Sequence, residues 1–229
     1  GDPVGAAEAA IGDLYAVGYT DGSFAEDPEE IDFLVGDGAD HVGEQGPTIL
    51  YEYSIDNISF FASATDGVDT AWGDTTVGGS GLGPDTGDVA YSLAAKYDAG
   101  NWWAALSYAK HDDASEIGLG AEATFDAFTV KGIYMHYDDR FVGPATEHDY
   151  TAGLAAAYQV DAWTIKGFWR RDSFDGVGAE DYDSFGIGAD YDLGGGATLA
   201  GGIVNSDYFD EDNGGRGDTV ADLGIKFKF

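Results

Sequence analysis

The stretch Thr219–Phe229, TVADLGIKFKF, alternates between apolar and polar side chains. One face carries mostly apolar residues, whereas the other carries Asp222, Lys226 and Lys228. A repeat of two residues is the period of a β-strand whose two faces meet different surroundings. The stretch 163–170, WTIKGFWR, follows the same rule, with both tryptophans on one face and the lysine and arginine on the other. These segments predict strands with one apolar and one mainly polar face.

Eleven such strands are predicted from Thr48 to the end of the chain. Their expected ranges are Thr48–Ser54, Ile58–Thr65, Asp88–Tyr97, Trp102–His111, Leu119–Asp126, Phe128–Tyr137, Asp149–Gln159, Trp163–Arg171, Tyr182–Asp192, Ala197–Asn205 and Thr219–Phe229. The connections are expected to alternate between short turns and long, acidic loops, such as Asp112–Gly118 and Asp138–His148. All the short turns then lie at one end of the sheet.

This asymmetry of the connections is typical of an outer-membrane β-barrel, which has short periplasmic turns and long external loops. Aromatic residues flank the short turns in four pairs: Tyr53 with Phe60, Tyr97 with Trp102, Phe125 with Phe128, and Tyr158 with Trp163. A second set lies near the long loops and includes Tyr91, Tyr108, Tyr134, Tyr150, Trp169 and Phe185. Two aromatic rows are expected at the two membrane interfaces. We therefore predict an all-β, antiparallel transmembrane barrel, although the same aromatics could fill the core of a soluble sandwich.

Composition restricts the partners of the chain. Its 229 residues include 10 Lys and Arg against 43 Asp and Glu, which gives a net charge of -33. Such a chain repels phosphates, so nucleic acid is excluded as a partner and cations are the favoured guests. Cysteine is absent, which excludes disulfides and thiolate metal sites. The sequence has no run of eighteen apolar residues, so no membrane-spanning helix is predicted.

Residues 1–47 are expected to form a separate unit, a long acidic loop, whereas residues 48–229 form the barrel wall. A short helix is predicted from Ala6 to Val17 and should end at Gly18. An apolar patch, formed by Ile31, Phe33, Leu34 and Val35, is expected to hold the loop against another part of the protein. Because a loop of this length in a compact domain is disordered or functional, its acids are candidate functional residues.

An antiparallel bacterial barrel closes with an even number of strands, so eleven cannot close. At least one further strand is therefore expected to precede Gly1, unless the strands are miscounted.

Four stretches resemble the general porins of Rhodobacter-type alphaproteobacteria. They are GDPVGAAEAAIGDLYAVGYTD at 1–21, TILYEYS at 48–54, YDLGGGATLAGGI at 191–203 and VADLGIKFKF at 220–229. The resemblance implies a sixteen-stranded barrel of the Gram-negative outer membrane, assembled as a homotrimer, in which the loop after the fifth strand folds inward and narrows the pore. The five preceding strands would then be missing here. Phe229 matches the final residue that the barrel-insertion machinery reads in that family.

The function expected from this resemblance is passive diffusion of small hydrophilic solutes through a water-filled, cation-preferring pore. A diffusion pore needs a steric neck and a field between acids and bases. The expected acids of the constriction loop are Asp21, Glu26, Asp27, Glu29, Glu30, Asp32 and Asp37. The expected residues of the facing lumen wall are Glu52, Lys96, Lys131, Lys166, Arg170, Asp222 and Lys226. Further expected partners are outer-membrane lipid and lipopolysaccharide.

The residue pattern also bears on other functions. An enzyme is not expected, because neither the four histidines nor the serines form a recognisable catalytic motif. No cofactor is required, although Asp207, Asp210 and Asp212 could offer oxygen ligands to calcium. Solvated acidic loops are the favoured interpretation of those residues. The alternatives to a general pore are a solute-specific outer-membrane channel and a secreted, acidic β-sandwich that binds calcium or glycans.

Overall fold

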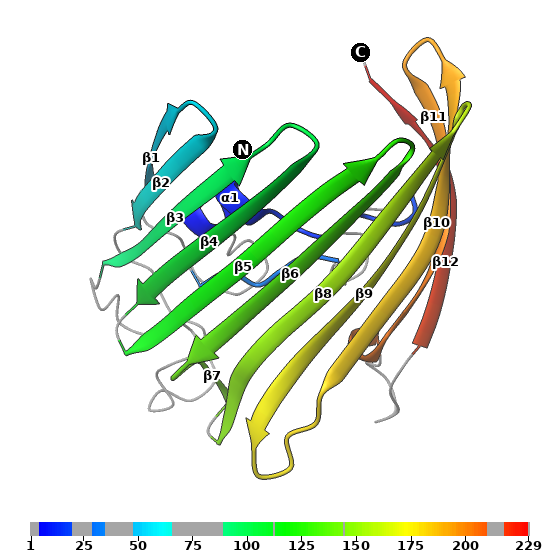
Figure 1. The fold of residues 1–229 in the computed structure, drawn as a ribbon. Coiled ribbons are helices and arrows are strands. Elements are labelled where there is room, and N and C mark those ends of the chain that lie inside the picture. The colour runs from blue at the N-terminus through cyan, green and yellow to red at the C-terminus, as the bar shows by residue number, and fades with distance from the viewer. Residues whose placement is uncertain are drawn as a thin grey trace.

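The chain forms one antiparallel sheet that curves strongly about its own axis (Figure 1). The computed structural model describes residues 5–19, 29–34, 48–65, 89–111, 113–143, 145–209 and 218–228. Eleven strands follow one another in chain order: β1 Thr48–Ile55, β2 Ile58–Thr65, β3 Ala90–Asp98, β4 Trp102–His111, β5 Ala114–Phe125, β6 Phe128–Asp138, β8 Thr146–Val160, β9 Trp163–Gly176, β10 Tyr182–Gly194, β11 Ala197–Ser206 and β12 Asp218–Phe227. A short strand, β7 Phe141–Gly143, pairs only with β8. The eleven predicted wall strands are confirmed.

The short turns lie together at one end of the sheet, at the top of Figure 1. Asp56, Asp126 and Asp161 each begin a two-residue turn with a positive φ, between 51° and 53°. Aspartate is one of the few residues other than glycine that adopts this conformation readily. The tight turns explain why consecutive strands pair directly with one another.

The strict alternation of short and long connections was wrong at β4 and β5. The loop expected at Asp112–Gly118 belongs mostly to β5, which pairs His111 with Ala114 and Lys110 with Ser115. Likewise β8 begins at Thr146 and β9 continues to Gly176, inside the loops that were expected there. Backbone pairing does not depend on side-chain polarity, so strands continue beyond the apolar segment that the sequence pattern marks.

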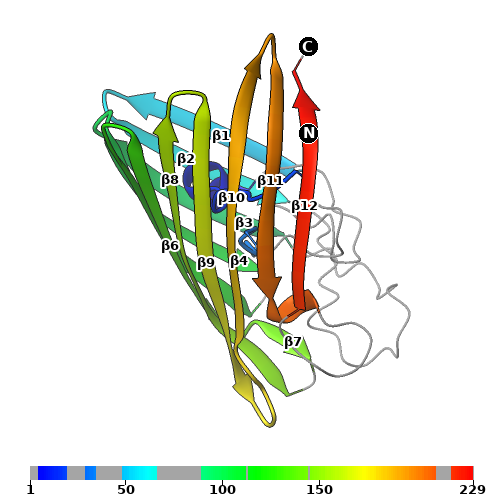
Figure 2. The same cartoon turned by 90° about the vertical axis from the view of Figure 1, so that its right-hand side faces the viewer.

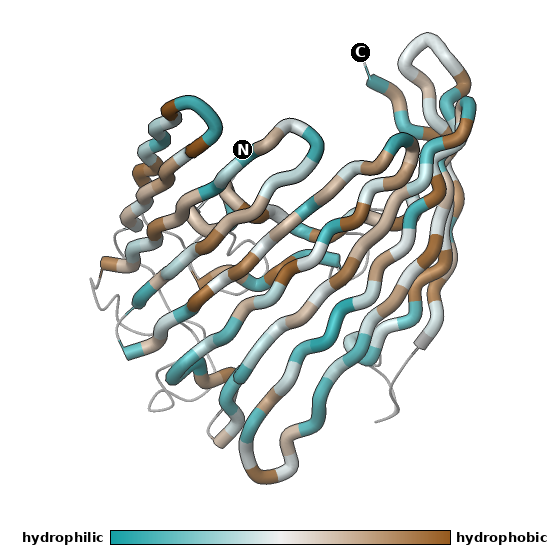
Figure 3. Tube along the Cα trace, in the orientation of Figure 1, coloured by the Kyte–Doolittle hydropathy of each residue, from teal (hydrophilic) through white to brown (hydrophobic). Residues whose placement is uncertain are grey.

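The two faces of the sheet differ in exposure. Along β8 and β9, the outward side chains Leu154 and Ile165 are 55% and 43% exposed, whereas the inward Ala155 and Phe168 are 5% exposed or less. Apolar and polar residues accordingly alternate along most strands (Figure 3). An apolar outer surface of this extent is suited to lipid rather than to water.

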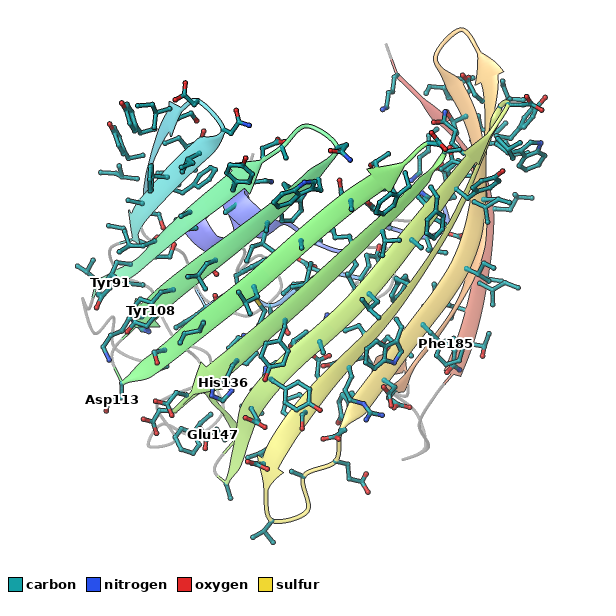
Figure 4. All side chains as sticks on the ribbon, in the orientation of Figure 1. Tyr91, Tyr108, Asp113, His136, Glu147 and Phe185 are labelled. Atoms are coloured by element: carbon teal, nitrogen blue, oxygen red, sulfur yellow. The ribbon has the colours of Figure 1, made fainter. Side chains whose placement is uncertain are left out.

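Aromatic residues cover both ends of this outer face. All four predicted pairs beside the short turns are exposed, and the rings of Tyr97 and Trp102 lie 5.4 Å apart. At the other end, Tyr91, Tyr108 and Phe185 point outward (Figure 4). These two aromatic rows have the arrangement expected at the two interfaces of a membrane.

The segment 5–19 lies against the concave inner face of the sheet (Figure 2). Its helix, α1, spans only Ala6–Ile11 and does not continue to Val17 as predicted. Gly12 ends it with φ 62°, and its N–H donates to the carbonyl oxygen of Glu8 at 2.7 Å. A glycine with a positive φ commonly ends a helix. Here the helix ends at Gly12, before Gly18, where the sequence predicted its end.

A compact apolar core lies between this segment and the wall. Ile11, Leu14, Ile31 and Phe33 are all at most 5% exposed and pack with inward residues of β3, β4, β6, β8, β9 and β11. The apolar patch was predicted to hold the loop in place, and the structure shows that Ile31 and Phe33 do so against the wall. None of the described helices is long and apolar enough to span a membrane. Among the described strands, no pairing joins β1 to β12, so the sheet path is open between them.

Candidate functional site

The inner wall carries glycines where the segment 5–19 touches it. A Cβ atom placed on Gly120, Gly153 or Gly202 would lie 2.7, 2.8 or 2.6 Å from Ile11, Leu14 or Val17, respectively. Glycine thus permits a closer approach of the segment to the wall than any other residue would. Because Gly120 lies on β5, Gly153 on β8 and Gly202 on β11, the segment crosses most of the inner wall.

Substitution of Gly202 by valine should lower the free energy of unfolding by about 1–3 kcal/mol through overpacking. Besides Val17, the new Cβ would meet the backbone nitrogen of Gly18 and the carbonyl oxygen of Ile187, both at 3.1 Å, and backbone atoms cannot easily move aside. Urea titration of the refolded protein in detergent measures this. The control is Gly132→Val on the outer face, where a Cβ would meet only the flexible end of Leu154 at 3.3 Å and a backbone oxygen at 4.0 Å. Equal stability of the two variants would contradict the close approach.

Polar groups of the wall anchor the segment 5–19 along its length. The backbone N–H of Ala6 donates to the hydroxyls of Ser63 and Ser92, at 3.1 and 2.8 Å. Further along, the hydroxyl of Tyr15 donates to Oε2 of Glu122 at 2.7 Å. Burial, this hydrogen bond and the charge of Glu122 all raise the pKa of Tyr15, so its hydroxyl remains a donor.

The far end of the segment is fixed by β12. The backbone N–H of Tyr19 donates to Oδ2 of Asp222 at 2.9 Å. Asp222, predicted as a lumen-wall residue, therefore holds the loop. The anchors run from β2 to β12, so the loop spans the concavity from one side to the other.

A second described segment, 29–34, lies beside the first. The N–H of Leu14 donates to the carbonyl oxygen of Glu29 at 3.1 Å, and the N–H of Ile31 donates to Oδ1 of Asp13 at 2.9 Å. The ammonium of Lys131 donates to the carbonyl oxygen of Asp13 at 2.5 Å. Asp13 therefore connects the two segments to each other and to β6.

Wall side chains also hold the backbone of 29–34 directly. The carbonyl oxygen of Asp32 accepts hydrogen bonds from the Tyr137 hydroxyl and from Nη1 of Arg140, both at 2.8 Å. Nη1 of Arg170 donates to the carbonyl oxygen of Glu30, and Nη2 lies 3.1 Å from Oδ2 of Asp32. Two arginines and one tyrosine thus converge on two carbonyls of the loop.

Arg140 keeps its charge in this position. Burial alone would lower its pKa, but Tyr137, Asp32 and Glu116 raise it above the ordinary arginine value. Its guanidinium also lies over the ring of Tyr137, 4.4 Å from the ring centroid. Oε2 of Glu116 accepts the N–H of Leu34 at 2.6 Å, so this cluster binds the loop backbone through both a donor and an acceptor of the wall.

Asp172 lies behind Arg170 and is itself fully enclosed. Its Oδ2 lies 2.8 Å from Nε of Arg170, and its two oxygens also accept the hydroxyls of Thr151 at 2.5 Å and Tyr208 at 2.9 Å. Nε2 of His148 lies 3.5 Å from Oδ1 of Asp172. A buried charge pair needs such additional hydrogen bonds to be tolerated. Asp172 therefore supports Arg170 from the wall side.

Some of the predicted site residues are brought together and others are not. Arg170 meets Glu30 and Asp32, whereas Lys131 meets Asp13, which was not predicted. The other predicted wall residues lie on the inner face beside wall residues. Lys166 pairs with Asp190 at 2.9 Å, and the ammonium of Lys96 lies 3.9 Å from the ring centroid of Trp103. Glu52 is opposite Phe61 of β2, and Lys226 is opposite Thr198 of β11. Glu29 is 8% exposed and contributes its backbone oxygen.

Several predicted positions lie outside the described residues. They are Asp21, Glu26, Asp27 and Asp37 of the loop, Phe229 at the end of the chain, and Asp210 and Asp212 of the calcium hypothesis. The third member of that hypothesis, Asp207, accepts the backbone N–H of Asp183 at 2.9 Å. In the part of the chain that the structure describes, no three acidic or histidine residues are grouped as metal ligands would be.

Tyr137, Arg140 and Glu116 are not among the functional residues predicted from the sequence. Glu116 lies where the sequence pattern predicts a loop, and Arg140 lies in the connection that follows β6. Tyr137 could have been found, because it continues the inward alternation of Lys131, Ile133 and Met135. Arg140 gives no such signal, because its guanidinium reaches the loop from outside the regular strands.

The sequence and the fold of this chain are similar to those of known porins. A family model described as Gram-negative porin matches residues 1–211. The chain belongs to the Gram-negative porin family. It is 36% identical over 255 residues to a porin of Rhodobacter capsulatus, an alignment that covers 100% of this chain and 76% of that protein.

Solved porin structures have the same fold. A porin refined at 1.8 Å resolution matches with a TM-score of 0.75 and 33% identity, over 100% of this chain and 76% of that one. A triple mutant of the Rhodopseudomonas blastica porin matches with a TM-score of 0.54 and 26% identity, over 80% of this chain and 55% of the mutant. This porin is therefore a channel of the Gram-negative outer membrane and not an enzyme.

Proposed function

We propose that this porin passes small hydrophilic solutes by passive diffusion and prefers cations, with the inward loop as its neck. The charge balance of the inner face is the observation that supports this proposal. Acidic side chains on the inner face of the described strands are Glu52, Asp98, Glu116, Glu122, Asp172, Asp190, Asp192 and Asp222. The basic ones are Lys96, Lys131, Lys166, Arg170 and Lys226.

Two of the five basic side chains of the wall are paired with carboxylates. Lys166 is paired with Asp190, and Arg170 is paired with Asp172 and Asp32. Each such pair contributes little field of either sign to the lumen, and acids remain in excess among the other side chains. The loop segments add Glu8, Asp13, Glu29, Glu30 and Asp32 to the acidic side. A lumen with this balance concentrates cations and repels anions.

Reversal potentials under a salt gradient across a planar bilayer test the preference. The intact protein should favour potassium over chloride, more strongly in salt of about 0.1 M, where the screening length is about 10 Å, than in about 1 M salt, where it is about 3 Å. The double variant Glu30→Gln with Asp32→Asn should lower the permeability ratio by roughly twofold per removed charge, because ~0.5 kcal/mol is the Coulomb energy at ~8 Å in water. The two carbonyls that bind the wall remain in this variant.

Asp161→Asn is the matched control. It is the same chemical change in an exposed turn at the short-turn end, and asparagine tolerates the φ of 52° there. The control should keep the permeability ratio of the original protein. An original protein that selects anions, or a double variant with unchanged selectivity, would remove the loop acids from the explanation.

The assembled state follows the same proposal. The outer face of the described strands is apolar between two aromatic rows, which suits outer-membrane lipid, with lipopolysaccharide at the long-loop end. We further propose a homotrimer, inserted by the barrel-assembly machinery that recognises the final Phe229. Passive diffusion requires no cofactor. Retention of the trimer and of its conductance in a calcium chelator would agree with this, whereas their loss would favour a structural calcium ion in the acidic loops.

A further inference from the structure

The segment 29–34 has no regular secondary structure, although it lies on the inner face of a membrane barrel. Irregular backbone at this depth is tolerated only where protein or water satisfies its polar groups. Four of its residues use backbone groups to bind partners elsewhere in the chain, in addition to the bond from Leu14: Glu30 and Asp32 accept, whereas Ile31 and Leu34 donate. The contact between loop and wall is thus made largely through the loop backbone.

We infer that Arg170, Arg140 and Tyr137 are positioning residues of the neck, which set its width by holding the carbonyl oxygens of Glu30 and Asp32. This inference rests on the proposed role of the loop as the neck. It assigns Arg170 a different role from that of a charge in the facing wall. The charge and the position of the neck are then separable at Glu30, whose carbonyl takes the anchoring bond, whereas Asp32 is held by its carbonyl and by its carboxylate.

The three donors come from different parts of the fold. Tyr137 belongs to β6, Arg140 to the connection between β6 and β7, and Arg170 to β9. Tyr137 and Arg140 share the carbonyl of Asp32, and Arg170 holds the carbonyl two residues earlier and also the Asp32 carboxylate. Hydrogen bonds from β6 and its following connection on one side, and from β9 on the other, fix the distance between the segment and the wall. They also restrict rotation of the segment.

Arginine suits this role better than lysine. The guanidinium of Arg170 donates through Nη1 to Glu30 and through Nη2 to Asp32 and Asp172, and its Nε lies 2.8 Å from Oδ2 of Asp172. A planar group with five N–H donors can serve these partners simultaneously, whereas an ammonium is a single compact point. Lysine at this position would keep the charge but release some of the partners.

The permeation rates of neutral sugars through the protein in liposomes report the width of the neck independently of its charge. With sugars of one to four rings, Arg170→Met should increase the rate for the larger sugars several-fold relative to the smallest, and should increase the noise of the open-channel current. Arg140→Met and Tyr137→Phe should change the series in the same direction by less. Arg170→Lys should resemble Arg170→Met in the sugar series, while keeping a more nearly original reversal potential.

Arg171→Met is the matched control. Arg171 is the next residue of β9, points to the outer face and forms an ion pair with Asp183 at 2.5 Å, so the control also breaks an arginine–aspartate pair. Its sugar series should be unchanged. The single variant Glu30→Gln, which keeps the carbonyl of Glu30 and the carboxylate of Asp32 that Arg170 contacts, should also keep the original series.

Two results would overturn the inference. One is an original sugar series in Arg170→Met together with an altered reversal potential, which would make Arg170 a wall charge. The other is an original series in Arg140→Met and in Tyr137→Phe, and these variants decide the matter if Arg170→Met does not fold into a heat-modifiable barrel. Absence of cation preference in the original protein would contradict the proposed selectivity but would leave this test intact, because the sugars are neutral.

Discussion

Replacement of Asp172 by alanine is expected to lower the free energy of unfolding by about 3–5 kcal/mol, because it leaves a buried arginine without its counter-charge. Arg170 is 4% exposed, and Asp172 is itself fully buried. Removal of the carboxylate would also leave the hydroxyls of Thr151 and Tyr208 without their acceptor. The remaining polar partners of Arg170 named above, the carbonyl of Glu30 and the carboxylate of Asp32, belong to the loop rather than to the wall.

Urea titration of the refolded protein in detergent or lipid vesicles measures this loss of stability. Asp183→Ala is the appropriate control, since it removes an aspartate that also pairs with an arginine, but in a pair that is 39% and 34% exposed. Exposed pairs are worth about 0–1 kcal/mol. Equal losses in the two variants would show that Asp172 is not the buried support that its contacts indicate.

Leu154→Arg is expected to lower the free energy of unfolding by about 2–4 kcal/mol, because arginine on the lipid face of a barrel strand is costly near the middle of the bilayer. Leu154 lies in the central part of β8, points outward and is 55% exposed. Its surroundings on that face include the exposed Trp169 at the paired position of β9. No acidic group stands at that paired position.

The control for this variant is Thr164→Arg. Thr164 lies on the inner face of β9, opposite Asp190 on β10, so an arginine there gains an acidic neighbour and water. Stability measured by urea titration in lipid vesicles should change little. A stable Leu154→Arg variant beside an unstable Thr164→Arg variant would reverse the assignment of the two faces.

Strand identity and facing were predictable from the sequence because they depend on neighbours two residues apart. In β9, the alternation of Trp163, Ile165 and Trp169 with Lys166 and Arg170 marked the outer and inner faces correctly. The aromatic rows were predictable for the same reason, since each pair lies on the two strands joined by a turn of two or three residues. The ends of strands were harder to predict, as β5 shows, because polar residues continue a strand as well as apolar ones do.

The loop was only partly predictable. Its apolar residues Ile31 and Phe33 indicated that the loop is packed against other residues. The end of α1 at Gly12 could not be predicted, because it depends on the positive φ of this glycine, which only the structure shows. Arg170 was predicted to face the lumen, and it does so. Its partners could not be inferred, because they include a backbone carbonyl, which every residue of the loop possesses.

By itself, the sequence determined the eleven strands, their two faces and the acidic character of the inward loop, since these follow from local periodicity and composition. Only the tertiary structure decided which groups hold the loop. Arg170 is 138 positions from Asp32 and Arg140 is 108, and curvature of the sheet brings both to one short segment. Hydrogen bonds to backbone carbonyls cannot be inferred from the loop sequence, because every residue has a carbonyl oxygen, whatever its side chain.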